Sequence, residues 1–264
     1  MSSRGALLLL LLLSAAPASA TLQPGQSNDV FSVIDREGNL ITVSNRTDGA
    51  ASFIQLTSFN RYRGMNWDRS HADGFLERVN SIFVDPAGNL LVAGVRLWQG
   101  ATYLWVMKYA PSGQLLWENV DSAPGCVAFA VVGNEEGEAW AAGSCLDQGR
   151  SQARLIHISP SGGTRWSQSY SEGRRSYVRG LYLDFSGRVT LSIEVGANQY
   201  GGGSPRGVVY NKNGGRVAVY LNEYPLSRRP LALALRRLGA DDEHRHLRAP
   251  DGPRVADARP GQRL

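Results

Sequence analysis

Hydrophobic and polar positions alternate along most of the chain in short runs, as is typical of β-strands. Runs rich in Val, Ile, Leu, Tyr and Trp extend over a few residues each and end at Gly, Pro or Asp. Such runs predict half-buried strands joined by tight turns, and the body of the chain shows no helical period. One representative stretch contains four runs, at residues 81–84, 90–94, 103–109 and 115–117.

Two turn motifs recur with a spacing of about fifty residues. The first places Gly three residues after Asp or Asn, and its glycines are Gly38, Gly88, Gly137 and Gly187. The second precedes a short apolar run, and its glycines are Gly113, Gly162 and Gly214. Four strands in about fifty residues predict one β-propeller blade, because leucine-rich repeats are shorter and ankyrin or tetratricopeptide repeats need helices.

The sequence therefore predicts an all-β fold. We expect four four-stranded antiparallel blades between residues 28 and 222, arranged as an incomplete or open propeller, because most propellers have more blades. Both faces of each blade are expected to be largely apolar. In the first turn motif, Asp accepts hydrogen bonds from the turn backbone and Gly takes the positive φ, as in a three-residue hairpin loop with a bulge.

The second motif supports a resemblance to a known family. The segments from Gly113 to Trp117 and from Gly162 to Trp166, together with the Asp-x-x-Gly-Asn-Leu-x-Val-Ala-Gly strand pair at residues 85–94, resemble bacterial secreted β-propellers of the SBBP type. They are more loosely similar to the tryptophan-docking repeats of quinoprotein-like propellers. The resemblance implies that recurring tryptophans lie as wedges between blades. These are Trp67, Trp117 and Trp166, whereas the fourth unit has Val217 or Ala218 at this place.

The resemblance does not extend to a cofactor. Quinoprotein-like propellers hold a quinone with adjacent cysteines and calcium ligands, and the sequence contains neither feature. We therefore expect no cofactor.

The two ends of the chain differ from the body. Residues 1–20 combine Arg4, an apolar run at residues 7–13 and the small residues Ala18 and Ala20, which predicts a signal peptide and a secreted or periplasmic protein. The apolar run is too short to span a bilayer. Residues 223–264 are rich in Arg and carry +3 of the net charge of +5, so the rest of the chain is close to neutral. We expect this tail to be disordered and not to extend the propeller, as at the end of a truncated or frameshifted longer propeller.

The basic tail does not predict a nucleic-acid partner. Its Arg residues are interleaved with Asp and Glu and have no aromatic neighbours, whereas single-stranded nucleic acid is bound through aromatic stacking. No nucleic-acid partner and no membrane span are expected.

Cys126 and Cys145 lie on the first and second predicted strands of the third blade. A two-residue loop at Glu135 and Glu136 would place them directly opposite each other, whereas a three-residue bulged loop would place them on opposite faces. An even number of cysteines in an exported protein favours the disulfide.

Candidate functional residues lie in the segments that do not repeat. In a four-stranded meander, the second turn and the link to the next blade lie at one end of the strands, which we call the variable face. Its irregular segments are residues 68–80, 96–102, 121–125, 146–152, 171–177 and 196–206. Varied loops on a rigid scaffold are where binding usually occurs. The candidate ligand-binding residues are Asp68, His71, Trp98, Arg174, Arg175 and Tyr200.

These candidates favour binding over catalysis. His71 is the one histidine of the variable face, and a catalytic or metal site needs several converging groups, so no catalytic residue and no metal ligand is assigned. Arg174 with Arg175, and Trp98 with Tyr103, suit an anionic or sugar-like ligand.

The sequence thus predicts an exported, non-enzymatic β-propeller binding protein with an unknown protein or carbohydrate ligand on the variable face. The alternative is a truncated fragment of a larger propeller enzyme, a hydrolase, lyase or oxidoreductase without its catalytic blades.

Overall fold

The computed structural model describes residues 29–48, 51–147, 149–173, 175–196 and 203–221, and these residues form strands and turns without a helix. The first sheet contains β1 (Val30–Ile34), β2 (Leu40–Asp48), β3 (Ala51–Phe59) and β4 (Met65–His71). The second contains β5 (Leu76–Val84), β6 (Leu90–Trp98), β7 (Ala101–Tyr109) and β8 (Leu115–Pro124). The third contains β9 (Cys126–Gly133), β10 (Ala139–Asp147), β11 (Arg150–Ile158) and β12 (Thr164–Tyr170). The fourth contains β13 (Ser176–Leu183), β14 (Val189–Val195), β15 (Ser204–Tyr210) and β16 (Arg216–Leu221).

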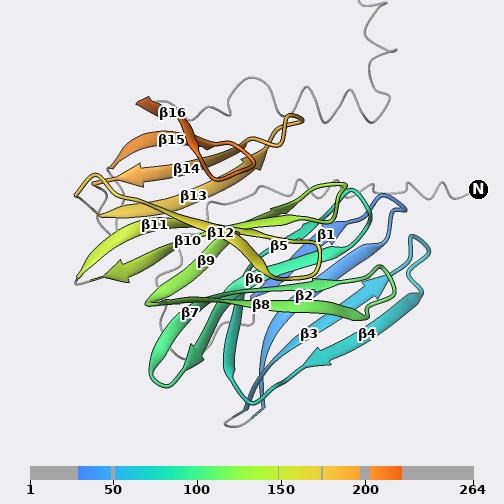
Figure 1. Cartoon of the computed structure of the whole chain (residues 1–264). Helices are drawn as coiled ribbons and strands as arrows, with labels where there is room; N and C mark the ends of the chain where they lie inside the picture. The colour runs from blue at the N-terminus through green and yellow to red at the C-terminus, as the bar shows by residue number, and fades with distance from the viewer. Residues whose placement is uncertain (1–28, 49–50, 148, 174, 197–202, 222–264) are drawn as a thin grey trace, which may run out of the picture.

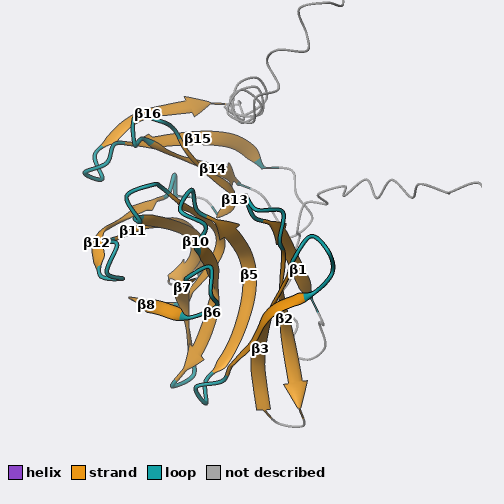
Figure 2. Cartoon of the chain, turned by 90° about the vertical axis from the view of Figure 1, so that its right-hand side faces the viewer, coloured by secondary structure: helices purple, strands orange, loops and turns teal. Residues whose placement is uncertain are grey.

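The four sheets form an open, propeller-like array, which confirms the predicted fold class (Figure 1). Each sheet is an antiparallel meander in chain order. The first strands of consecutive sheets, β1, β5, β9 and β13, lie next to one another, and the sheets fan out from them (Figure 2). The array is not closed, so the first and fourth sheets each turn one face outward.

Apolar side chains fill the three junctions between consecutive sheets. Ile54 and Leu56 of the first sheet pack with Val92 and Trp105 of the second, and all four are fully buried. The other two junctions have cores of the same kind. These contacts follow from the alternation along each strand, because every second side chain points toward the neighbouring sheet and most of these side chains are apolar.

A tryptophan of each of the first three sheets docks onto a glycine of the next sheet. Trp67, Trp117 and Trp166 contact Gly113, Gly162 and Gly214, where a Cβ atom would lie 2.6, 2.8 and 2.9 Å from the indole. The expectation of tryptophan wedges between sheets is therefore confirmed. In the fourth sheet the corresponding residue is Ala218. Its pairing with Val209 in the sheet register is equivalent to that of Trp166 with His157.

The predicted disulfide between Cys126 and Cys145 is present, but its register arises differently from the two-residue loop considered above. The turn at Asn134–Glu138 is of the bulged type, with Gly137 at a φ of 82°. A second bulge between Ala142 and Gly143 then shifts the pairing by one residue and brings Cys145 opposite Cys126. The same shift occurs on the first strands of the second and fourth sheets.

Several expectations fall on residues that the structure does not describe. The signal peptide at residues 1–20 and the tail at residues 223–264 lie outside the described residues. Within the described ranges, no helix has the length and apolar character of a membrane span.

Candidate functional site

Each junction between sheets carries charged partners near the variable face. At the second junction, Asp121 at the end of β8 accepts a hydrogen bond of 2.9 Å from Nη2 of Arg154 in β11. At the third junction, Glu172, after β12, accepts a hydrogen bond of 2.9 Å from Nε of Arg206 in β15. An acidic residue at the end of one sheet therefore pairs with an arginine of the next.

The first junction departs from this one-to-one arrangement. Arg96 in β6 forms ion pairs with Glu77 in β5, Glu118 in β8 and Asp73 in the β4–β5 link, the last at 2.5 Å. Glu77 and Arg96 are opposite each other in the sheet register. Glu118 also accepts a hydrogen bond from the indole nitrogen of Trp105. We call Arg96, Asp73, Glu77, Glu118 and the adjoining His71 the Arg96 cluster.

His71 brings the first sheet into the cluster. It ends β4, and its Nε2 lies 3.2 Å from Oε2 of Glu77 and 3.9 Å from Oδ2 of Asp73. The contact with the Glu77 carboxylate raises the pKa of His71, and burial opposes this shift. The ring also lies 5.9 Å from that of Trp105. The interaction between His71 and Glu77 thus joins the first two sheets through a titratable group whose pKa is raised.

The donor set of the cluster is that of a divalent-cation site, but Arg96 fills its centre. One ligand atom each from His71, Asp73, Glu77 and Glu118 lies within 4.8 Å of the others. Arg96 contacts all three carboxylates, so its guanidinium lies where a metal ion would otherwise bind and offsets part of their negative charge. We assign the Arg96 cluster as an ion-pair network that stabilises the packing of the first sheet against the second.

Apolar and aromatic side chains lie at the strand ends of the variable face beside the cluster, Leu76 and Leu97 on one face of the second sheet and Trp98 and Tyr103 on the other. Leu76 and Leu97 face each other across β5 and β6 and are 57% and 38% exposed. Trp98 is 46% exposed, and its ring centroid lies 5.9 Å from that of Tyr103. Tyr103 pairs with Pro124, and the following Gly125 accepts a hydrogen bond from the backbone of Leu146, which is also exposed. We call Leu76, Leu97, Trp98, Tyr103 and Leu146 the variable-face patch.

A second polar group is buried between the third and fourth sheets. His157 in β11 stacks on Trp140 with 4.4 Å between ring centroids, and the edge of Trp166 closes the other side. Neither ring nitrogen of His157 has a hydrogen-bond partner among the residues that the structure describes, and Oε1 of Glu138 lies 3.5 Å from Nε2. Burial lowers the pKa of His157 to about 4. The corresponding residue of the second sheet, Lys108, instead forms a buried ion pair with Asp85 at 2.8 Å.

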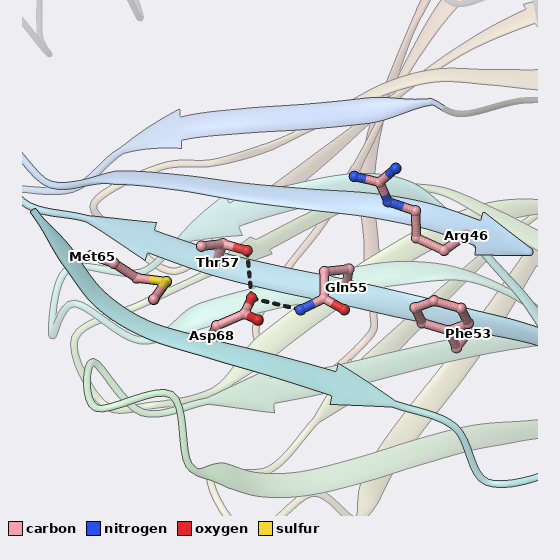
Figure 3. Close-up of a pocket in the computed structure, with 6 residues that line it drawn as sticks. All are labelled: Arg46, Phe53, Gln55, Thr57, Met65 and Asp68. Atoms are coloured by element: carbon pink, nitrogen blue, oxygen red, sulfur yellow. Dashed lines mark hydrogen bonds between the residues drawn. The ribbon is translucent and has the colours of Figure 1, made fainter. Parts of the chain in front are cut away.

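The outward face of the first sheet carries an open depression of about 620 Å³, the first-sheet depression (Figure 3). Asp68 accepts hydrogen bonds on Oδ1 from the amide of Gln55 at 2.5 Å and from the hydroxyl of Thr57 at 2.7 Å. These two bonds, that from Thr57 foremost, lower the pKa of Asp68. Arg46 and Phe53 lie at one end of the depression and Met65 at the other.

The structure separates the predicted ligand-binding residues. His71 belongs to the Arg96 cluster and Trp98 to the adjacent variable-face patch, whereas Asp68 lies on the opposite face of β4 from His71 and lines the first-sheet depression. Arg175 is exposed just before β13, and its carbonyl accepts a hydrogen bond from the backbone of Gly196. Arg174 and Tyr200 lie outside the described residues.

Sequence reasoning missed Glu77, Arg96 and Glu118. They lie in or next to strands that look like scaffold, and their convergence depends on how the sheet registers align. One signal was available: Arg96 follows Arg46, and Glu118 follows Asp68, at the spacing of the repeat.

No protein-family model and no curated protein sequence matches the chain. Among solved structures, the chain is similar to the polysaccharide lyase Uly1 with 10% identity and a TM-score of 0.47, over 75% of this chain and 50% of that one. It is similar to an endo-arabinase from Bacteroides thetaiotaomicron with 12% identity and a TM-score of 0.36, over 67% of this chain and 72% of that one.

A mutant of the Synechocystis apocarotenoid oxygenase is 9% identical with a TM-score of 0.34, over 73% of this chain and 60% of that one. The chain thus spans about half the length of the lyase and three fifths of the oxygenase. Similarity at this level carries no information on substrate or activity.

Proposed function

We propose that this chain is an exported, non-enzymatic propeller-type binding protein that contacts a partner through the variable-face patch. One observation carries the proposal. At all three junctions, the ionisable groups near the variable face are paired with one another, while apolar and aromatic side chains beside them are left exposed.

Paired carboxylates are poorly suited to acid–base chemistry, because an adjacent guanidinium donates hydrogen bonds to the lone pairs that would accept a proton. Glu77 and Glu118 both have Arg96 as such a partner. The variable-face patch instead has the composition of a binding surface, since exposed aromatic residues clustered with aliphatic ones mark interaction sites.

The signal peptide predicted for residues 1–20 and the disulfide support action outside the cytoplasm. The ligand class that suits the variable-face patch best is a protein surface with an apolar contact area.

The alternative, a fragment of a larger propeller enzyme, is favoured by the exposed apolar residues Val30, Ile34 and Met65 on the outward face of the first sheet. A further sheet could pack there only without the tryptophan–glycine contact of the internal junctions. The position that accepts the tryptophan is occupied in the first sheet by Arg63, with a φ of 70°.

The test compares the full secreted chain with the variant Leu97→Ser/Trp98→Ala in quantitative affinity capture from the surrounding extracellular or periplasmic fraction. Tyr62→Ala serves as the matched control, since Tyr62 is 78% exposed on a repeating turn away from the variable-face patch. We expect specific partners to be retained by the wild type and the control and lost by the double variant. Equal capture by all three proteins, or turnover of a substrate by the purified chain, would overturn the proposal.

A further inference from the structure

The first-sheet depression occupies the same repeat positions as the Arg96 cluster. Arg46 lies opposite Phe53, as Arg96 lies opposite Tyr103. Asp68 lies opposite Thr57, as Glu118 lies opposite Met107. The outward face of the first sheet is therefore the counterpart of the face that the second sheet turns toward the first.

The residues of this face differ from their counterparts in the way expected for contact with water or a polar ligand. Trp105 and Met107 are fully buried in the junction, and their counterparts in the first sheet are Gln55 and Thr57. Ser32 and Thr42 likewise stand where the second sheet has Ile82 and Val92. The outward face therefore mixes these polar residues with the exposed apolar Val30, Ile34 and Met65, whereas a largely apolar face was expected.

Arg46 has the position of Arg96 without the neighbours that neutralise Arg96. Arg96 contacts three carboxylates, whereas the one hydrogen bond of Arg46 among the described residues runs from its Nε to Oγ of Ser44 at 3.1 Å. The guanidinium of Arg46 therefore retains donors for a ligand. Arg96, at the equivalent position of the second sheet, pairs with carboxylates, so a carboxylate is the group that suits Arg46.

Asp68 and Gln55 supply acceptors beside this cation. The two hydrogen bonds to Asp68 are both on Oδ1, and the amide of Gln55 uses its nitrogen for one of them. Oδ2 of Asp68 and the amide oxygen of Gln55 can thus accept from hydroxyl groups. Phe53, at the same end of the depression as Arg46, offers an aromatic face (Figure 3).

We propose that the first-sheet depression binds an acidic saccharide, whose carboxylate pairs with Arg46, whose hydroxyls donate to Asp68 and Gln55, and whose ring packs on Phe53. An extended acidic peptide fits less well, because the depression lies on the face of the sheet over β2 and β3, which both have strand neighbours on each side, and a peptide strand adds at a sheet edge instead. The proposal is independent of the partner surface at the variable face.

The experiment measures binding of tri-galacturonate to the full chain by calorimetry, with galactotriose as the neutral probe and a hexaglutamate peptide as the peptide probe. Arg46→Gln removes the proposed carboxylate partner, and Phe53→Ala removes the aromatic face. Arg188→Gln is the matched control, because Arg188 is 53% exposed on a turn of the fourth sheet.

We expect the wild type and Arg188→Gln to bind tri-galacturonate more tightly than galactotriose, and Arg46→Gln to lose about tenfold or more in affinity. Phe53→Ala should weaken both saccharides alike, and Leu97→Ser/Trp98→Ala should bind as the wild type does. No saccharide binding by the wild type at millimolar concentrations, affinity unchanged in Arg46→Gln, or tighter binding of hexaglutamate would overturn the assignment. A variant that loses its native near-ultraviolet circular dichroism is replaced by Arg46→Lys, for which we expect a smaller loss of affinity.

Discussion

The indole nitrogen of Trp67 in the first sheet donates a hydrogen bond of 2.8 Å to the carbonyl oxygen of Pro111 in a turn of the second sheet. Trp166 makes the same bond to Lys212 at the junction of the third and fourth sheets, at 2.9 Å. In both cases the glycine two residues further along the turn lies against the indole. The tryptophan–glycine contact thus stabilises one end of a junction, and the ion pairs near the variable face stabilise the other end.

The first prediction tests this contact through Gly113→Ala. Gly113 has a φ of 78°, and an added Cβ would lie 2.6 Å from the indole of Trp67. The substitution combines backbone strain with overpacking, so we expect the free energy of unfolding to fall by about 2–4 kcal/mol. Chemical denaturation measures the change.

Gly100→Ala is the matched control for Gly113→Ala. Gly100 has a φ of 77°, and its added Cβ would meet nothing within 4 Å. It should therefore cost only the backbone strain, about 1–2 kcal/mol. Equal losses in the two variants would mean that the indole contact adds nothing to the stability of the junction.

The second prediction concerns the disulfide. Cys126 and Cys145 are 19 positions apart, and both are buried in the core between the second and third sheets. Replacing both by Ala should lower the free energy of unfolding by about 3 kcal/mol in the chain-entropy model, and more where the lost sulfurs leave a cavity. The unreduced, denatured wild type should release no thiol to a thiol reagent, and two thiols per chain would contradict the pairing.

The element pattern and the wedges could be predicted from the sequence because they depend on residues close together in the chain. Strand alternation and the turn glycines gave the four sheets, and the recurrence of Trp67, Trp117 and Trp166 gave the junction contacts. The pairing of Cys126 with Cys145 was correct, but its register depends on a bulge beyond the turn and not on the loop length that was weighed. Gly143 marks this bulge, since an added Cβ would lie 2.1 Å from the carbonyl oxygen of Val127, and an isolated glycine within a strand was the signal that was missed.

The Arg96 cluster could be predicted only in part. His71 stood out as a lone histidine among irregular residues, but its partner Glu77 comes from the next sheet. Which face of β4 turns toward that sheet depends on the bulge between Ser58 and Phe59. The same uncertainty explains why Asp68, three residues before His71, was grouped with it although the two side chains lie on opposite faces.

The third prediction concerns His157. Its pKa is lowered to about 4 because burial disfavours the charged form, and the ordinary value in the unfolded chain is about 6.5. The unfolded state therefore binds the proton first, so stability is full above pH 6.5 and falls as the pH drops toward 4. The loss from this group is about 3 kcal/mol.

His157→Leu should remove this loss, because Leu fills the space between Trp140 and Trp166 without a titrating group. Denaturant unfolding of the wild type and the variant between pH 4 and pH 7 measures the difference. Parallel stability curves over this range would show that His157 is not the group that titrates.

The fourth prediction concerns His71, whose pKa is shifted in the opposite direction. The groups that face it are Glu77, Asp73 and Glu118 as carboxylates, Arg96 as a cation and Trp105 as an uncharged ring. Three carboxylates outweigh one arginine, so a proton on His71 is favoured in the folded protein, and the contact with Glu77 is the largest cause that raises the pKa of His71. The folded state therefore binds this proton more tightly than the unfolded state.

The sign follows from this linkage. The contribution of His71 to stability is full below pH 6.5 and is lost as the pH rises through its raised pKa in the folded protein. His71→Gln should flatten the fall in stability on the alkaline side of pH 6.5 and leave the acidic side, governed by His157, unchanged. Glu77→Gln should also flatten it, because the first-named cause of the shift is then gone. An alkaline slope that persists in both variants would show that the first two sheets are not joined through the protonated histidine, because the proton would then be held elsewhere in the chain.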